Sequence, residues 1–155
     1  MDSINIRKQT RECVMQFLYE AEIQKQYDSE VRSVFLTHIQ RLRDYENENE
    51  IKDVYPIEKG YFNNVIDAVE INLMKIDKLI ESSAKNWRVE RISKVDLAIL
   101  RLSIAEIIFM DNIPESVSIN EAVELAKKFG NENSSKFING ILGKIVREKK
   151  TSHEG

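Results

Sequence analysis

Apolar residues recur along this chain with the three-to-four-residue spacing of amphipathic helices. The spacing predicts helices over about residues 4–24, 29–43 and 58–82 in the first half. In the second half it predicts a helix over about residues 94–110, a short helix from Ser118 to Gly130, and a last helix that begins at Asn133 or Ser134. Residues 94–110 are apolar on more than one face, which is typical of the central helix of a bundle. The pattern therefore predicts an all-α fold of about six to seven helices.

Polar residues placed before the apolar runs predict where the helices begin. The candidate caps are Asp2 or Ser3, Asp28 or Ser29, Ser93 with Asp96, and Ser118 with Glu121. Gly130 is the residue type that closes a helix in the left-handed conformation. The acidic stretch 44–58 loses the helical spacing and is interpreted as a solvated linker, and the tail after Lys149 is too polar to pack.

Composition restricts the fold class and the cellular compartment that we expect for this chain. The 155 residues include 5 Gly and 2 Pro, too few turn-forming residues for a many-stranded β-protein. The apolar runs are too short to span a membrane, and the first 19 residues do not read as a secretion signal. One cysteine excludes an intramolecular disulfide. We therefore expect a cytoplasmic protein without a transmembrane helix.

The chain offers little catalytic or metal-binding chemistry. Its histidines, His38 and His153, lie far apart, and Cys13 falls on an apolar helix face, where a buried hydrophobic role is the simpler interpretation. Gly140 and Gly143 lie inside a helical pattern, so we interpret them as sites of close helix packing. We expect no enzyme activity, no cofactor and no metal site.

Charge is segregated along the sequence. The formal net charge is −3, which argues against a strongly basic nucleic-acid-binding protein. However, residues 1–11 carry +2 and residues 127–150 carry +5, whereas residues 44–58 carry −5. Arg7 and Arg11 are one helical turn apart, with Lys8 about 100° around the helix, so they could follow a phosphate backbone. A plain solvated first turn would give the same pattern.

Several segments carry a resemblance to a known family. They are RECVMQFLY at residues 11–19, VDLAILR at 95–101 with Glu106, and VSINEAVELAK at 117–127 after Pro114. Phe129-Gly130 and KFINGIL at 136–142 follow. In this order the segments span almost the full chain, and together they resemble the NusB family of bacterial transcription antitermination factors.

The resemblance implies a single non-catalytic domain over residues 1–150. Two packed helical subdomains, about 1–83 and 84–150, would form it, with 151–155 as a polar tail. Members of the family bind the boxA element of ribosomal RNA transcripts together with NusE, a small-subunit ribosomal protein. The complex joins elongating RNA polymerase and suppresses termination. The implied partners are therefore boxA-like single-stranded RNA, NusE and the RNA polymerase antitermination complex, and a homodimer of the free protein stays open.

The resemblance also assigns roles to particular residues. The implied RNA-binding residues are Arg7, Lys8, Arg11, Lys136 and Phe137. The implied partner-binding residues are Tyr19, Glu90 and Asp96.

Three of these assignments compete with a structural role. Tyr19 lies one turn beyond the core stripe, so it suits a partial core position or an interface. Phe137 suits the core as well as RNA contact. Asp96 suits the capping box with Ser93 as well as the partner contact. The competing interpretation of the whole chain is a helical protein-interaction or self-association module whose RNA contact is incidental.

Overall fold

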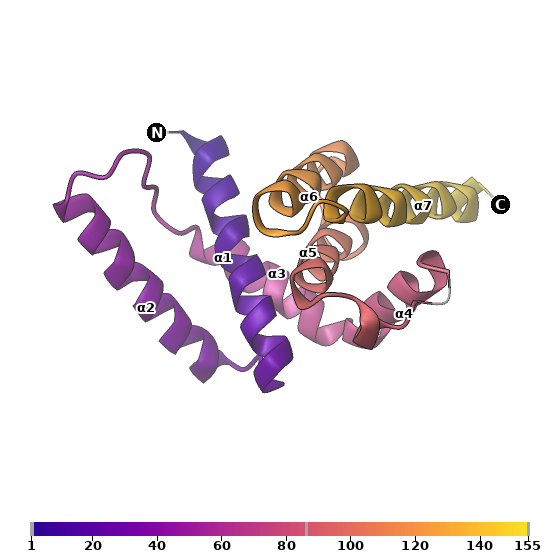
Figure 1. Ribbon diagram of the computed structural model, residues 1–155, viewed down its shortest axis with the longest axis horizontal. Helices are drawn as coiled ribbons and strands as arrows, with labels where there is room; N and C mark the ends of the chain where they lie inside the picture. Colours follow the sequence, from indigo (N-terminus) through magenta and orange to yellow (C-terminus); the bar gives the residue numbers. More distant parts are fainter. Residues whose placement is uncertain (1, 86, 155) are drawn as a thin grey trace.

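The computed structural model describes the backbone of residues 2–85 and 87–154, and their side chains as far as Thr151. These residues form a helical bundle without a strand, which confirms the predicted fold class (Figure 1). The α-helices are α1 (Ser3–Gln24), α2 (Ser29–Glu48), α3 (Lys59–Ile71), α4 (Leu73–Ser83), α5 (Lys94–Ile104), α6 (Glu115–Phe129) and α7 (Ser134–Glu154). A 3₁₀ turn, η1 (Val89–Arg91), precedes α5, and a π-helical segment, η2 (Ala105–Phe109), follows it.

Three predicted helix caps are confirmed. The side chains of Asp2, Asp28 and Ser93 each accept a hydrogen bond from the backbone N–H three residues later, at 3.0–3.2 Å. Each bond satisfies a donor that the first turn of a helix leaves unpaired. These caps fix the start of α1, α2 and α5.

The boundaries of α6 differ from the prediction. Pro114 stands before the first residue of α6, and the helix starts at Glu115, so Ser118 lies inside the helix and is not a cap. Gly130 follows α6 with φ −89° and ψ −170°, so the predicted left-handed closure is wrong. A Cβ at Gly130 would clash with the Ser134 side chain and lie 2.8 Å from the Ala126 carbonyl oxygen, so close approach requires glycine here.

α2 is longer than predicted. It continues to Glu48, into the stretch interpreted as a linker, and only residues 49–58 connect it to α3. The Gln40 side chain donates to Asp44 Oδ1 one turn later, at 3.0 Å. Because Glu and Gln are good helix formers, a solvent-exposed helix can continue there without apolar spacing.

The predicted helix over residues 58–82 is two helices. They meet at Asn72, whose side chain donates to the Ala68 carbonyl at 2.9 Å. The backbone N–H of Asn72 donates to the same carbonyl at 3.2 Å, so the side chain shares this acceptor with the helical hydrogen bond. The buried apolar positions continue on both sides, from Phe62 to Ile80, so the spacing alone conceals the break.

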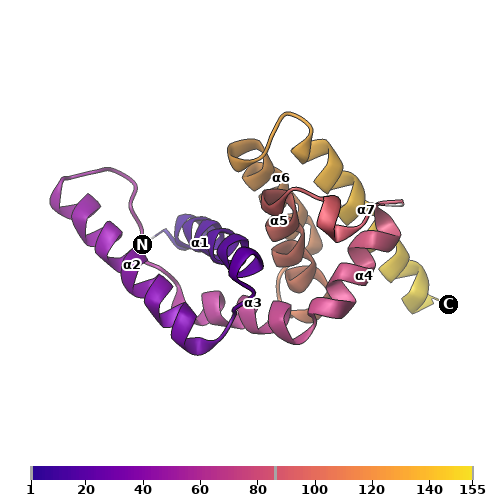
Figure 2. The same ribbon diagram turned by 60° about the horizontal axis from the view of Figure 1, so that its bottom comes forward.

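α5 is the central helix, as predicted. All residues from Asp96 to Ile104 are buried. Figure 2 shows α5 between α1 on one side and α6 and α7 on the other, and α5 contacts all three helices. The expected helix over 94–110 is α-helical only to Ile104, because η2 replaces its last turns. π-helical segments of this kind occur often at functional sites.

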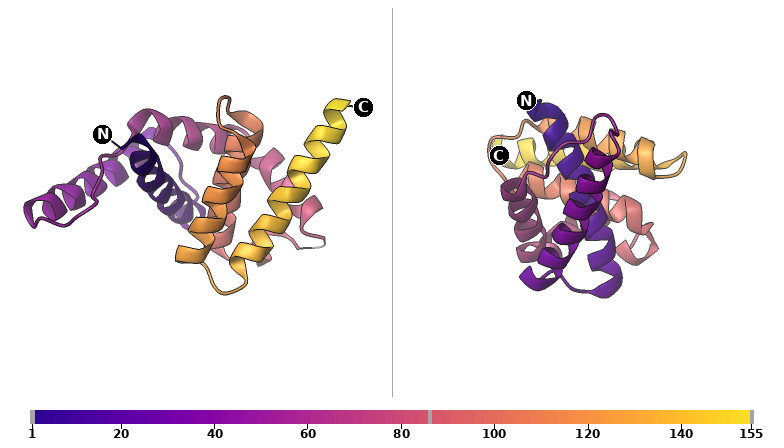
Figure 3. Two further views of the ribbon diagram at one scale, coloured as in Figure 1. Left: turned by 90° about the horizontal axis from the view of Figure 1, so that it is seen from above. Right: turned by 90° about the vertical axis from the view of Figure 1, so that its left-hand side faces the viewer.

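α2 extends from the body of the bundle, as the left view of Figure 3 shows. An aromatic cluster holds it, in which Phe35 lies 5.5 Å from Phe17 of α1 and 5.9 Å from Phe62 of α3, measured between ring centroids. Within the described ranges, no helix is both long enough and apolar enough to cross a membrane. The backbone of the predicted polar tail continues α7 to Glu154, and residue 155 lies outside the described residues.

Candidate nucleic-acid interface

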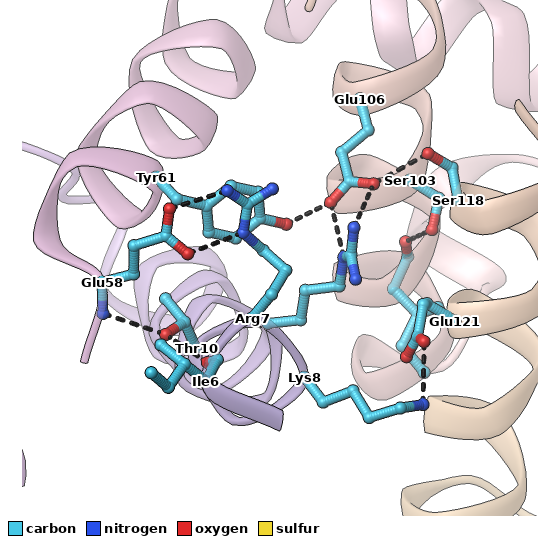
Figure 4. A network of polar contacts seen from close by, with 12 residues as sticks. Ile6, Arg7, Lys8, Thr10, Glu58, Tyr61, Ser103, Glu106, Ser118 and Glu121 are labelled. Carbon is cyan, nitrogen blue, oxygen red and sulfur yellow. Dashed lines mark hydrogen bonds and ion pairs between the residues drawn. The ribbon is translucent and has the colours of Figure 1, made fainter. Parts of the chain in front are cut away.

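Arg7, near the start of α1, is part of a polar network (Figure 4). Its guanidinium donates to both carboxylate oxygens of Glu58, at 2.8 and 2.7 Å, and lies 4.1 Å from the centre of the Tyr61 ring. The Arg7 side chain is 32% exposed and that of Glu58 38% exposed. Hydrogen bonding and the charge of Arg7 hold the pKa of Glu58 below its usual range. Arg7 is therefore at the surface, but it already has an anionic partner.

Lys8 has a similar arrangement on the neighbouring face of α1. Its Nζ lies 2.8 Å from Oε1 of Glu121 on α6. One turn further along α1, Glu12 pairs with Lys128 at 2.7 Å, near the end of α6. These two pairs connect α1 and α6 along a seam in which both lysines remain exposed at the surface.

Arg11 is buried, so the expectation that it faces solvent beside Arg7 is wrong. Its Nε donates to Glu106 of η2 at 2.8 Å. Glu106 also accepts from the hydroxyl groups of Tyr61 and of Ser118, the latter at 2.7 Å. Burial acts to lower the pKa of Arg11, but the hydrogen bond and charge of Glu106 outweigh it and the pKa is raised.

The buried network therefore joins four elements at one carboxylate. Arg11 comes from α1, Tyr61 from α3, Glu106 from η2 and Ser118 from α6. Burial, with a further contribution from Glu106, raises the pKa of Tyr61, so the phenol keeps its proton and acts as a donor. In this conformation Arg11 cannot reach a phosphate; it fixes α1 against the centre of the bundle.

Lys136 and Phe137 lie in the first turn of α7. Lys136 is exposed, whereas Phe137 is partly buried and packs against the core. The Phe137 ring centroid lies 6.3 Å from that of Trp87, which is 52% exposed. Both roles considered for Phe137, core packing and surface contact, are thus open to it.

Trp87 and its neighbours were missed in the sequence analysis. Residues 85–94 carry four cations and one acid around this tryptophan. An aromatic residue flanked by basic residues, as Trp87 is by Lys85 and Arg88, is typical of single-stranded nucleic-acid sites and is the signal in the sequence. The net positive charge of the two ends of the chain is the stronger signal in the sequence, and this segment is internal.

The predicted partner-binding residues lie around the start of α5. Tyr19 is 38% exposed and lines a cavity of about 310 Å³ with Phe35, Leu42, Val95 and Phe129. Glu90 is exposed on η1.

Asp96 is buried, and its backbone N–H donates to Ser93 Oγ. The carboxylate oxygen Oδ1 of Asp96 is buried without a hydrogen-bond partner within the described structure. The capping role of Asp96 thus uses its backbone, and its carboxylate is left available for another contact.

The structure brings some predicted residues together and separates others. Asp96 and Phe137 line one cavity of about 440 Å³, together with Trp87 and Arg91. Arg7 and Arg11 line a different cavity between α1 and the start of α6. The two predicted RNA-binding groups therefore occupy two sites rather than one.

Other chemistry is limited in the part of the chain that the structure describes. Burial raises the pKa of the Cys13 thiol to about 11, which fits a buried hydrophobic role. Among the described residues, His, Cys, Asp and Glu do not gather in any group of three that could hold a metal ion.

Comparisons with known proteins agree on one family. The NusB family profile matches residues 8–147. The chain is 45% identical over 150 residues to transcription antitermination protein NusB of Acetivibrio thermocellus, covering 96% of this chain and 94% of that protein. A crystal form of T. maritima NusB is similar with a TM-score of 0.71 and 33% identity, covering 92% of this chain and 91% of that one.

A further solved structure contains antitermination factors NusB and NusE in complex with dsRNA. It matches with a TM-score of 0.68 and 26% identity, over 92% of this chain and 97% of that one. The family profile and these matches cover most of the chain described above. The chain therefore belongs to the NusB family.

Proposed function

We propose that this chain is an RNA-binding transcription antitermination factor. It binds boxA-like single-stranded RNA of ribosomal RNA transcripts together with NusE, and the complex supports processive elongation by RNA polymerase. The observation that carries this proposal is family membership over residues 8–147, combined with a similar structure in which NusB, NusE and RNA occur together.

The seam between α1 and α6 supports RNA contact. Arg7 and Lys8 are exposed enough to exchange Glu58 and Glu121 for phosphate oxygens, because surface ion pairs are individually weak. Lys128, 61% exposed at the far end of this seam, extends the row of cations. Arg11 contributes indirectly, since its bond to Glu106 orients the turn of α1 that carries Arg7 and Lys8.

The region around Tyr19, Glu90 and Asp96 suits the protein partner. A buried carboxylate oxygen without a donor is unfavourable, so a donor group from NusE would find a ready acceptor in Asp96. Tyr19 is partly exposed and lines an apolar cavity, and tyrosine is a residue type enriched at protein interfaces.

The central experiment is a titration of RNA against the chain with and without NusE. Fluorescence anisotropy would follow a boxA-like single strand, a scrambled single strand and a duplex of the same sequence. We expect the boxA-like strand to bind most tightly, and NusE to strengthen that binding. Equal affinity for the scrambled strand, whether or not NusE is present, would disprove the proposal.

A charge-reversal pair tests the α1 site. Arg7→Glu with Lys8→Glu should weaken RNA binding at least about tenfold and leave NusE binding unchanged, because two phosphate contacts become repulsive. The matched control is Lys75→Glu with Lys78→Glu on the exposed face of α4. If both pairs weaken RNA binding equally, the effect reflects net charge and the site lies elsewhere.

Asp96→Asn tests the partner contact. The cap with Ser93 uses the backbone of Asp96, so this change should leave the melting temperature nearly unchanged. We expect weaker NusE binding by isothermal titration calorimetry and normal RNA binding by the free chain. Loss of helical content with normal NusE binding would assign Asp96 a structural role instead.

A second candidate function is self-association. α2 exposes three apolar side chains, Val34 at 68%, Leu42 at 43% and Tyr45 at 62%. Sedimentation equilibrium of the free chain and of a Val34→Lys, Tyr45→Lys variant would test it. A concentration-dependent dimer that this variant abolishes would support self-association through α2.

A further inference from the structure

Trp87 is the largest side chain in the chain and it is 52% exposed. It does not lie alone, because the Phe137 ring is 6.3 Å away and tilted by 59°. Together these residues, the Trp87–Phe137 pair, form an aromatic wall between η1 and the start of α7. Trp is a residue type enriched at interfaces, where one part of the ring is buried and another meets solvent.

Hollows lie on both sides of the Trp87–Phe137 pair. One cavity, of about 470 Å³, is also lined by Lys85, Lys136 and Gly140. The other, of about 440 Å³, is also lined by Arg91, Asn131 and Asp96. Asn133 borders both. A planar group entering either hollow would lie against aromatic carbon, with amide and charged groups at its edge.

At Gly140 the cavity of about 470 Å³ reaches the backbone of α7. It lies inside α7, where glycine is a poor helix former. A Cβ at this position would meet nothing within 4 Å, so the expected close helix packing at Gly140 is wrong. The absent side chain leaves space in the cavity that Trp87, Lys136 and Phe137 border.

The charges around this wall are available to a partner. Five exposed cations of this region form no ion pair with a carboxylate within the described ranges. They are Lys85, Arg88, Arg91, Lys94 and Lys136. Glu90 and the buried Asp96 are the acids within residues 85–96. The cations Arg7, Lys8 and Arg11 of α1, by contrast, each pair with a carboxylate of the chain. An anionic partner would therefore meet less competition from the chain's own acids on the surface around Trp87.

We propose that the Trp87–Phe137 pair stacks a base of single-stranded RNA in the hollow beside Gly140. Lys85 and Lys136 then hold the flanking phosphates. Stacking accepts any base, and unpaired cations supply attraction to the backbone, which is the combination that single-strand-binding proteins use. This inference rests on the proposed RNA-binding function and specifies which surface holds a base.

The chain has one tryptophan, so its fluorescence reports on this site alone. The experiment titrates a boxA-like single-stranded RNA into the chain with NusE present and records tryptophan emission beside the anisotropy of labelled RNA. The signal from NusE alone is subtracted. Stacking should quench or shift the emission with the same midpoint as the anisotropy change. Unchanged emission at saturating RNA would overturn the inference while leaving the proposed function intact.

Absence of any RNA binding in the anisotropy channel would overturn the proposed function, and the inference with it. The two failures are thus distinguishable in one titration.

Substitutions of the aromatic wall give a second test. Trp87→Ala should weaken RNA binding at least about fivefold, and Trp87→Phe should restore most of it, since a smaller ring still stacks. Tyr45→Ala removes an aromatic side chain that is also exposed, on α2, and should have no effect. If Trp87→Ala weakens NusE binding and leaves RNA binding unchanged, the surface is a protein contact and the inference fails.

Substitutions at Gly140 distinguish an effect on RNA binding from an effect on folding. Gly140→Ala and Gly140→Gln both introduce better helix formers, so both should raise the melting temperature. RNA affinity should fall nonetheless, and more for Gln, whose longer side chain fills the hollow. A stabilised Gly140→Gln variant with unchanged RNA affinity would overturn the proposed position of the base.

Discussion

At the residue scale, Glu106 is the carboxylate on which the buried polar contacts converge. It accepts hydrogen bonds from Arg11, Tyr61 and Ser118, and all of these side chains are buried. Glu106→Gln removes the negative charge and leaves the Arg11 guanidinium buried without a counter-charge. Breaking a buried ion pair by removing one partner costs about 3–5 kcal/mol. We predict a loss of that size in the free energy of unfolding, measured by urea denaturation.

Two comparisons isolate the buried charge. Arg7→Gln breaks a surface pair and should lower the free energy of unfolding by at most about 1 kcal/mol. Arg11→Met combined with Glu106→Gln should be less destabilising than Glu106→Gln alone, because no charge is then left unpaired and the amide oxygen can still accept from Tyr61 and Ser118. Equal losses for Glu106→Gln and Arg7→Gln would contradict the central role of this carboxylate.

Cys13 gives a second prediction at this scale. Burial raises the pKa of its thiol to about 11, above the 9.0 of a free cysteine. The thiolate is the reactive form, so at pH 8 the folded chain should react with a thiol reagent about a hundredfold more slowly than the urea-unfolded chain. Absorbance of the reagent's leaving group measures both rates. Equal rates would mean that α1 exposes this face readily.

The sequence predicts some of these residue roles and conceals others for a simple reason. Helix caps at Asp2, Asp28 and Ser93 involve residues three apart, so local spacing reveals them. The partner of Arg11 is 95 residues away, and no local pattern indicates it. A basic residue in the first turns of a helix therefore reads as surface charge, although here it lies in the centre of the bundle.

At the scale of elements, Arg101 joins three helices through two carboxylates. It lies on α5 and donates to Glu22 of α1 at 2.6 Å and to Asp77 of α4 at 3.0 and 2.8 Å. Burial acts to raise the pKa of Glu22, but hydrogen bonds from Lys25 and Arg101 outweigh it and the pKa is lowered. The ionised form of Glu22 is thus the one that stabilises the fold.

This lowered pKa predicts an acid-dependent loss of stability. A carboxylate whose pKa is lower in the folded state stabilises fully above its unfolded pKa, about 4.3 for Glu. The contribution disappears as the pH falls through the lower, folded pKa. Glu22→Gln should therefore be less stable than the original chain at pH 7 and show a shallower fall in melting temperature below about pH 4.3.

Glu20→Gln, at an exposed position of the same helix without an ion pair in the described structure, is the control. It should retain the original pH profile. A Glu22→Gln profile parallel to that of Glu20→Gln would show that Arg101 does not couple these helices through Glu22.

The spacing of apolar residues predicts where the helices lie along the chain. It does not predict where they begin and end, because that depends on contacts outside the apolar stripe. The apolar stripe from Phe62 to Ile80 is predicted correctly, yet the helix is interrupted at Asn72, where the side-chain amide and the backbone N–H share the Ala68 carbonyl. Residues 44–48 belong to α2 although they carry no apolar stripe. This end of α2 is exposed, so it has no core-facing side that would produce such a stripe. Both differences lie at positions that the apolar spacing does not mark.

At the scale of the whole molecule, the small net charge of −3 conceals two different basic surfaces. Acids from distant parts of the chain, Glu58 and Glu121, neutralise the cations of α1, and only the three-dimensional fold brings them together. The surface around Trp87 keeps its cations unpaired. The sequence therefore predicts the number of charges, whereas the fold decides which of the cations have an acidic partner within the described structure.

Removing the carboxylates that pair with Arg7 and Lys8 should change RNA affinity in the opposite direction to removing these cations. If Arg7 and Lys8 must leave Glu58 and Glu121 to bind phosphate, removing these acids should favour RNA binding. Because each exposed pair is worth at most about 1 kcal/mol, Glu58→Gln and Glu121→Gln should each raise affinity by up to about fivefold. Anisotropy titrations with NusE present would measure the change.

The matched control for these carboxylates is Glu124→Gln on α6, whose acid pairs with Lys127 rather than with α1. It removes the same charge and should raise RNA affinity less than Glu121→Gln does. Weaker RNA binding by Glu58→Gln would mean that Glu58 orients Arg7 toward phosphate instead of competing with it. The α1 site would then be preformed, and its ion pairs would persist in the RNA complex.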